Sequence, residues 1–246
     1  MSKDQNLYKQ ELWDEGYKDF NFFIAGDADP VKQFLLSSLP QAGNECFEVG
    51  CFPGRYLAVL GEMGWELNGL DQTKHLEDME KWFTDKEYKT GKFINADFEV
   101  FNSDKKYDLV YSFGFIEHFL NFEDIILAHL KLVRPGGTII ITTPNFNGLQ
   151  GSFHRFFDLN NYEKHNVKSM NIKKWKKILL ENNFSVKRTG HFGKIDLWYD
   201  WQSRPYYKRF FLYRLMSILP FLKKLIFFNS RTLSPFCGII GIKEGE

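Results

Sequence analysis

The sequence predicts an α/β fold with a mostly parallel sheet covered by helices on both faces, and two observations support this prediction. Short segments rich in β-branched and aromatic residues alternate with segments whose apolar residues recur at helical spacing. That alternation is typical of β-α-β units. The 246 residues include 43% hydrophobic and 17% aromatic residues, which suits one sizeable domain with a full core.

Five strands and three helices are expected between the N-terminus and Thr143. The strands are short, most end in a polar residue or glycine, and they are expected at 44–50, 65–71, 92–97, 107–113 and 137–143. The helices between them are expected at 55–64, 75–88 and 122–133. We expect the run from Arg134 to Gly137, which reads RPGG, to end the third helix.

The rest of the chain is expected to complete the sheet. A helix is predicted at 170–182, a sixth strand at 184–190 and a buried last strand at 236–243. Within one domain spanning 1–246 we expect N-terminal cap helices, a ligand-binding core, a substrate loop and a basic aromatic insertion, at 1–40, 41–143, 144–170 and 193–235. Two helical pieces that separate at Pro220 fit the insertion.

The charge of the chain is uneven. Its net charge is +1, but residues 201–243 contain eight basic residues and no acidic one, whereas the others contain 24 basic and 31 acidic residues. The acidic body argues against a nucleic-acid partner. The basic, aromatic segment 204–231 is expected to pack as a lid or homodimer contact, or to meet an anionic partner such as a membrane surface.

Composition also bears on the compartment. The three cysteines lack metal-binding spacing, and their odd number argues for a reducing environment. The polar N-terminus is not a signal peptide, and no stretch reaches the ~18 apolar residues of a membrane span. We therefore expect a cytoplasmic protein, either free or at the inner face of the membrane.

A glycine-rich turn lies where the first strand meets its helix. Gly50 can adopt backbone conformations closed to other residues, and Gly54 lets a ligand approach closely. The helix that begins near Arg55 directs free N–H groups at such a ligand. A dinucleotide-binding motif would have glycine at the positions of Phe52 and Arg55, so a nicotinamide oxidoreductase is disfavoured.

Acidic residues follow the next two strands. Asp71 ends the second strand, one helix and one strand after Gly50, where a carboxylate can accept both ribose hydroxyls of a nucleoside. Asp97 and Phe98 follow the third strand, and a carboxylate beside an aromatic ring suits an adenine. Each feature alone is common, but their occurrence at the ends of consecutive strands predicts a nucleoside-containing cofactor.

Four segments resemble successive motifs of class I S-adenosylmethionine-dependent methyltransferases. They read CFEVGCFPGRYLAVLGEMGWELNGLD, NADF, YDLVYSFGFIEHF and LVRPGGTIIITTPN. The resemblance implies a Rossmann-like fold with a seven-stranded sheet that is parallel except for its last strand. It also implies cofactor contacts at Glu48, Gly50, Gly54, Arg55, Asp71, Asp97, Phe98, Ser112 and Phe113.

In that assignment the methionine part of S-adenosylmethionine lies against Glu48 and the glycine loop, and Ser112 and Phe113 lie beside the sulfonium. The sulfonium and ammonium are cations, which favour acids and aromatic faces. Tyr17 of the N-terminal segment is a further candidate contact on this ground, although Trp13 and Tyr17 would equally suit the packing of an N-terminal helix.

Three regions hold candidates for the acceptor side of the reaction. His118 follows the fourth strand and could take a proton from a hydroxyl group, or could simply order its loop. Asn145 ends the fifth strand and could bind the acceptor. His154 and His165 lie in the next loop, where specificity is often built, and each could instead be structural.

No metal is expected. In the related quinone-pathway O-methyltransferases the loop after the fourth strand carries two acids and a histidine that can hold a divalent metal. Glu117 and His118 match that pattern, but Gly114 occupies the place of the first acid.

The resemblance extends to a bacterial subgroup associated with surface polysaccharides. It implies O-methylation of a sugar or phosphorylated precursor in capsule or surface-polysaccharide biosynthesis, with an acceptor that can be anionic or lipid-linked. An N-methyltransferase acting on an amino sugar or small amine is the nearest alternative. A non-catalytic scaffold subunit that keeps the cofactor fold is another.

Overall fold

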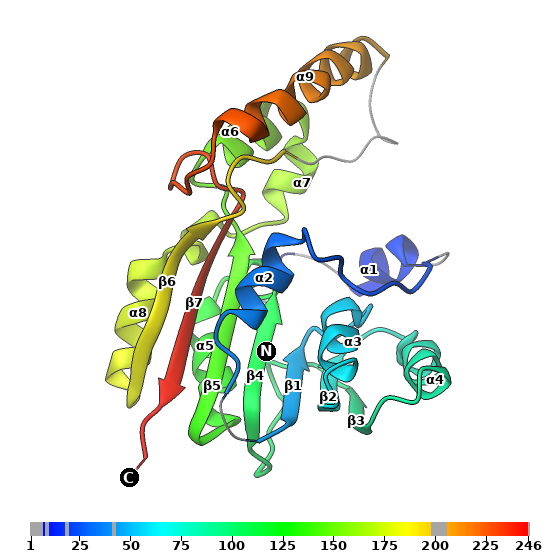
Figure 1. Cartoon of the computed structure of the whole chain (residues 1–246), viewed down its shortest axis with the longest axis vertical. Helices are drawn as coiled ribbons and strands as arrows, with labels where there is room; N and C mark the ends of the chain where they lie inside the picture. The colour runs from blue at the N-terminus through cyan, green and yellow to red at the C-terminus, as the bar shows by residue number, and fades with distance from the viewer. Residues whose placement is uncertain (1–6, 8–9, 18–19, 41–42, 198–205, 246) are drawn as a thin grey trace, which may run out of the picture.

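The computed structural model describes residues 7, 10–17, 20–40, 43–197 and 206–245, and its centre is one seven-stranded sheet (Figure 1). The strands are β1 (Glu45–Val49), β2 (Glu66–Asp71), β3 (Thr90–Asn95), β4 (Tyr107–Phe113), β5 (Val133–Pro144), β6 (Phe184–Phe192) and β7 (Phe236–Lys243). Their order across the sheet is β3-β2-β1-β4-β5-β7-β6. Strands β1 to β5 pair in parallel, and β7 runs antiparallel to both of its neighbours. The predicted fold class is confirmed.

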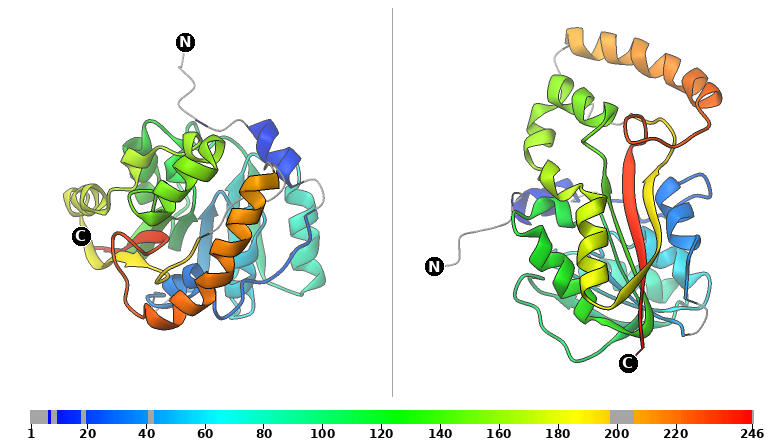
Figure 2. Two further views of the ribbon diagram at one scale, coloured as in Figure 1. Left: turned by 90° about the horizontal axis from the view of Figure 1, so that it is seen from above. Right: turned by 90° about the vertical axis from the view of Figure 1, so that its left-hand side faces the viewer.

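Helices cover both faces of the sheet (Figure 2). One face packs against α5 (Phe122–Lys131) and α8 (Ile172–Glu181), and the other against α2 (Pro30–Leu36), α3 (Arg55–Gly61) and α4 (Leu76–Asp85). Successive strand residues therefore enter opposite cores. Because both faces are buried, the central strands are almost continuously apolar.

A third group of helices lies beyond the carboxyl ends of the strands (Figure 1). It contains α6 (Leu149–Phe157), α7 (Leu159–Glu163) and α9 (Tyr206–Leu225). Buried side chains of α6, α9 and the segment before α9 form a small separate core of Phe153, Ile195, Leu197, Leu212 and Leu219. Within the described residues no helix, α9 included, combines the length and the apolarity needed to cross a membrane.

Two sequence predictions of local structure are wrong. The two helical pieces expected to separate at Pro220 form the single helix α9, which contains this proline. Leu212 and Leu219 of α9 are both buried in the same small core, and that packing holds the helix together around the missing backbone hydrogen bond. Part of the expected insertion, residues 198–205, lies outside the described residues.

The second difference concerns the segment Arg134–Gly137, which does not end a helix. Helix α5 already ends at Lys131, and the segment belongs to β5. Val133 and Thr138 of β5 pair with residues of β4 that are only two positions apart, so the residues between them bulge out of register. Gly136 has a φ of +76°, which glycine adopts without strain.

Replacing Trp175 by alanine should lower the free energy of unfolding by about 3–5 kcal/mol. The indole of Trp175 is fully buried between α8 and the sheet, and its Nε1 donates a hydrogen bond to the Ser169 carbonyl at 2.6 Å. Urea denaturation followed by circular dichroism measures the loss. Lys176→Ala on the exposed side of the same helix is the control, and equal losses in both variants would contradict this packing.

Candidate active site

A pocket of about 280 Å³ lies at the carboxyl ends of β1, β2 and β4, the edge at which parallel sheets bind ligands. This volume is near the lower end of the ~300–1,000 Å³ of small-molecule sites. The helix α1 (Gln10–Gly16) and the short 3-10 helix η1 (Ile116–His118) complete its wall. The residues expected from the sequence that line it are Tyr17, Glu48, Gly50, Gly54, Arg55, Asp71, Asp97, Phe98, Phe113 and His118.

The glycine loop forms the floor of the pocket. Gly50 and Gly54 have φ values of +71° and +78°. A Cβ added at Gly50 would lie 2.6 Å from the ring of Phe115, and one at Gly54 would lie 2.6 Å from the ring of Phe83. Both positions therefore require glycine for conformation and for space.

The carboxylate of Asp71 joins the glycine loop to the end of β2. One oxygen accepts a hydrogen bond from the Phe52 N–H at 3.1 Å, and the other accepts one from the Thr73 N–H at 3.0 Å. Burial raises the pKa of Asp71 to about 6, and the nearby Asp14 carboxylate adds to the shift. At neutral pH the group is therefore ionised and can accept further hydrogen bonds.

A second acid, Glu48, lies at the end of β1 and is almost fully buried. Its Oε2 has no hydrogen-bond partner among the described residues. Burial raises the pKa of Glu48 well above its ordinary value, and the positive charge of Arg55 opposes this shift. A buried carboxylate with an unsatisfied oxygen is suited to a cationic ligand group.

The loop after β3 supplies the residues expected at the adenine. The Asp97 carboxylate accepts a hydrogen bond from the Glu99 N–H at 2.9 Å, which fixes its position. The ring of Phe98 is buried and meets the rings of Phe115 and His129 edge-on, at centroid distances of 5.8 and 4.7 Å. This wall of the pocket is apolar with one carboxylate at its edge.

Aromatic side chains of the N-terminal segment contribute a further wall. The ring of Tyr17 lies 4.8 Å from that of Phe52, and the ring of Trp13 lies 5.2 Å from the imidazole of His118. Both Trp13 and Tyr17 line the pocket. The pocket is thus bounded by the N-terminal segment on one side and the strand ends on the other.

Three expected site residues do not line the pocket. Ser112 is fully buried, because it faces the opposite side of β4 from Phe113. Asn145 is also buried, and its amide donates to the carbonyls of Arg231 and Ser234 at 2.7 and 2.8 Å. It ties the end of β5 to the segment before β7 and does not line the pocket.

The third residue, His154, belongs to α6 and is fully buried. Its Nε2 lies 2.7 Å from the Gln150 amide, and its ring stacks on Phe146 at a centroid distance of 4.8 Å. Both His154 and Asn145 are enclosed by protein and hold neighbouring segments together, and the acceptor role expected of them stays a prediction.

His118 does line the pocket, and Glu117 and His165 lie beside His118 without lining the pocket themselves. Burial lowers the pKa of His118 to about 3, and the adjacent His165 contributes to the shift. Burial raises the pKa of Glu117 to about 8 and lowers that of His165 to about 4. Both imidazoles are neutral at neutral pH. No local signal links His165 to Glu117, since several helices and a strand separate them along the chain.

Comparison with known proteins identifies the family. A family model described as a methyltransferase domain matches residues 23–189, and the chain belongs to this family. The ubiquinone biosynthesis O-methyltransferase of Rickettsia prowazekii is 29% identical over 101 residues, which are 41% of this chain and 40% of that protein. Its counterpart in Rickettsia akari is 26% identical over 136 residues, 52% of this chain and 54% of that protein. The chain thus spans about half the length, or less, of the curated relatives it matches.

Solved structures share the fold at low sequence identity. A Bacillus halodurans protein described as a candidate methyltransferase gives a TM-score of 0.61 at 15% identity, covering 90% of this chain and 100% of that one. Phosphoethanolamine N-methyltransferase 2 of Haemonchus contortus, solved with S-adenosylmethionine, gives 0.58 at 14% identity, covering 87% and 52%. The predicted class I S-adenosylmethionine-dependent methyltransferase and its cofactor are confirmed at the level of the family.

The residues of the pocket fit this cofactor. The buried, unsatisfied oxygen of Glu48 suits the cationic methionine end, and the ionised Asp71 suits the ribose hydroxyls. Gly50 and Gly54 both line the pocket, and because neither carries a side chain the backbone of the loop is exposed to a ligand there. When bound, S-adenosylmethionine supplies an electrophilic methyl group.

Replacing Asp71 by alanine should abolish the thermal stabilisation by S-adenosylmethionine. The variant removes the ribose acceptor and frees the Phe52 N–H that holds the glycine loop. A ligand present at 100 times its Kd stabilises the native protein by about 2.7 kcal/mol, so loss of binding is readily seen in melting temperature. Asp104→Ala, in an exposed loop, is the matched control. An undiminished shift in the Asp71 variant would place the cofactor elsewhere.

The affinity for S-adenosylmethionine should fall as the pH is lowered through about 6. The pKa of Asp71 is about 6 in the free protein, so its proton must leave before the carboxylate can accept ribose hydroxyls. The Kd should therefore be lowest and independent of pH well above this pKa. Below the pKa it should rise by up to about tenfold per pH unit. Calorimetric titration between pH 7.5 and 5 measures the slope. Asp71→Asn should bind weakly without this slope, and an equal slope in that variant would assign the titration to another group.

Proposed function

We propose that the chain transfers a methyl group from S-adenosylmethionine to a hydroxyl oxygen. The observation that carries this proposal is the position of His118, whose imidazole lies at the wall of the cofactor pocket. A hydroxyl must lose its proton when its oxygen is methylated, and a neutral imidazole can assist that loss. The Rickettsia relatives, which are named O-methyltransferases, support oxygen as the acceptor atom.

The chain's own contribution would be to position the reactants and exclude water. Holding donor and acceptor in line can supply up to ~7–11 kcal/mol in favourable intramolecular models. The aromatic wall formed by Trp13, Tyr17 and Phe52 would keep water from the sulfonium, whose charge disappears in the reaction. Glu48 would hold the donor's cationic end.

The acceptor we propose is a hydroxylated ring. The flat faces of Trp13 and Tyr17 suit an aromatic ring, and the names of the relatives favour a hydroxylated aromatic compound. A sugar or phosphorylated precursor of surface polysaccharide, expected from the sequence, is the second candidate. The basic, aromatic C-terminal segment supports an anionic or lipid-linked acceptor.

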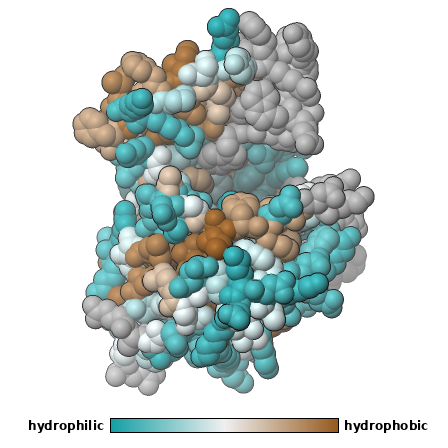
Figure 3. All heavy atoms as spheres, turned by 45° about the vertical axis from the view of Figure 1, so that its right-hand side comes forward, coloured by the Kyte–Doolittle hydropathy of each residue, from teal (hydrophilic) through white to brown (hydrophobic). Residues whose placement is uncertain are grey.

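The segment around α9 has the mixture of apolar and basic side chains that would suit an anionic or lipid-linked acceptor. Apolar side chains gather over the upper part of the molecule, which holds α9 (Figure 3). The exposed large apolar side chains there are Tyr213, Ile218, Phe221, Leu225, Phe227 and Phe228. Exposed Arg214 and Lys224 lie among them. The membrane and homodimer contacts expected of residues 204–231 stay predictions.

A methyl-acceptor screen tests the proposal. Purified protein is incubated with S-adenosylmethionine and each of three sets of compounds: hydroxylated aromatics, nucleotide-activated or lipid-linked sugars, and amines. We expect S-adenosylhomocysteine to accumulate only with hydroxyl acceptors. His118→Gln should lower the rate by about 10²–10⁴-fold. His191→Gln, at a histidine that does not line the pocket, should leave it unchanged.

Other results would distinguish the alternatives. Turnover with amines alone would assign N-methylation. Cofactor binding without turnover on any set, while a known methyltransferase is active in parallel, would favour a non-catalytic scaffold.

A further inference from the structure

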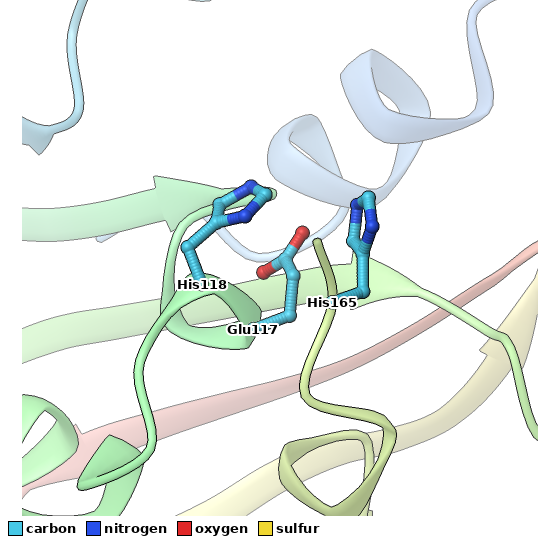
Figure 4. Close-up of side chains that lie close together, drawn as sticks. All are labelled: Glu117, His118 and His165. Atoms are coloured by element: carbon cyan, nitrogen blue, oxygen red, sulfur yellow. The ribbon is translucent and has the colours of Figure 1, made fainter. Parts of the chain in front are cut away.

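Glu117, His118 and His165 form a cluster beside the pocket (Figure 4). One carboxylate oxygen and one ring nitrogen from each histidine all lie within 4.8 Å of one another. The carboxylate of Glu117 points between the two rings (Figure 4). Glu117 and His118 come from η1, whereas His165 comes from the loop after α7, so the fold brings the three together.

The histidine rings are held by backbone carbonyls. Nδ1 of His165 lies 2.7 Å from the Asn161 carbonyl, and Nδ1 of His118 lies 3.1 Å from the Lys164 carbonyl. A carbonyl only accepts, so these contacts favour the proton on Nδ1 and a lone pair on Nε2. Hydrogen bonding of the second ring nitrogen to a carbonyl is typical of metal-bound histidines.

The carboxylate between the rings is unsatisfied. Glu117 is 1% exposed, and its Oε2 has no hydrogen-bond partner in the described part of the chain. Leaving a buried carboxylate oxygen unpaired is costly, and such groups are normally paired with a cation or hydrogen-bonded. A bound cation would remove this cost.

Further hydrogen bonds fix the two segments relative to each other. The Asn166 N–H donates to the Glu117 carbonyl at 2.6 Å, and the Asn166 amide donates to the Phe119 carbonyl at 2.8 Å. These contacts involve none of the cluster's functional groups. The loop that carries His165 is therefore positioned against η1 before any ligand binds.

The position of Gly114 explains why His165 is needed. Gly114 has a φ of +69°, and a Cβ there would lie 3.3 Å from Oε1 of Glu117. An acid at this position would be strained, and its Cβ would crowd the carboxyl group of Glu117. A third metal ligand would therefore have to come from another segment, and His165 lies in position to supply it.

We propose that Glu117, His118 and His165 bind one divalent transition-metal ion of the zinc class. Two imidazoles and one carboxylate favour Zn²⁺ or Co²⁺ over Mg²⁺, which prefers oxygen ligands. Metal–ligand bonds of about 2.0–2.2 Å would require the three side chains to draw together slightly. Three protein ligands leave a coordination position open.

The role of this metal rests on the proposed function, although its binding does not. The open position would take the acceptor hydroxyl and lower its pKa. The O–H bond then breaks with its proton passing to water. The oxygen–methyl bond forms as the sulfur–methyl bond breaks, and the sulfur keeps the electron pair. The assistance that His118 gives to this proton loss would then be exerted through the metal that it helps to hold.

Metal titration of the full chain tests the site. The protein is purified without a histidine tag, stripped with a chelator, and titrated with Zn²⁺, Co²⁺ and Mg²⁺ by calorimetry. We expect one equivalent of Zn²⁺ or Co²⁺ to bind, Co²⁺ to give visible absorption, and Mg²⁺ to bind at least about 10²-fold more weakly. His165→Gln and Glu117→Gln should each weaken Zn²⁺ binding by at least about 10²-fold, and Asn166→Ala by about 10–100-fold.

Control variants distinguish a loss of metal binding from a loss of folding or of catalytic activity. His191→Gln should bind Zn²⁺ like the unaltered protein. All variants should keep the thermal shift with S-adenosylmethionine, since none of the replaced residues lines its pocket. Zn²⁺ binding that is undiminished in both His165→Gln and Glu117→Gln, or absent from the unaltered protein, would overturn the site. One equivalent of Zn²⁺ bound without turnover of any hydroxyl acceptor would overturn the proposed function and leave the site standing.

Discussion

The bond between the Asp71 carboxylate and the Phe52 N–H is the constraint on which the active site depends. It ties the loop after β1 to the end of β2, while the N–H groups of Gly50 and Cys51 bind the Leu70 carbonyl. The loop can follow this path only because its glycines adopt positive φ values. The Asp71 carboxylate that shapes the loop is also ionised at neutral pH and can accept hydrogen bonds from a ligand. One side chain therefore both holds the loop in place and is available for ligand binding.

Two buried carboxylates extend this theme. Glu48 and Glu117 each have a buried oxygen without a hydrogen-bond partner among the described residues, which opposes folding, since unpaired polar groups are costly in a protein interior. Glu48 lines the pocket on the side assigned to the donor, and Glu117 adjoins His118 on the side proposed for the acceptor. A bound cation would remove this unfavourable contribution at each residue: the cationic end of the cofactor at Glu48, and the proposed metal ion at Glu117.

Sequence patterns predicted the sheet because local alternation and tertiary burial agree in a doubly covered sheet. They also predicted that Gly50, Asp71 and Asp97 would lie at one edge of the sheet, where all three line the pocket, since strand ends of parallel sheets meet at one edge. Sequence patterns did not predict side-chain contacts between segments that are distant along the chain. Asn145 is held by carbonyls of the segment before β7. His165 lies beside Glu117, although α5, β5, α6 and α7 separate the two along the chain. The glycines at 136 and 137 support a bulge, a choice made by strand pairing that local propensity does not encode.

The most direct measurement is a crystal structure of the chain with S-adenosylhomocysteine, the demethylated product of the cofactor. We expect the ribose hydroxyls to lie against the Asp71 carboxylate, the adenine beside Phe98, and the amino-acid end beside Glu48, with the sulfur facing His118. A nucleoside bound outside the strand ends, or one whose ribose lies away from Asp71, would contradict this placement.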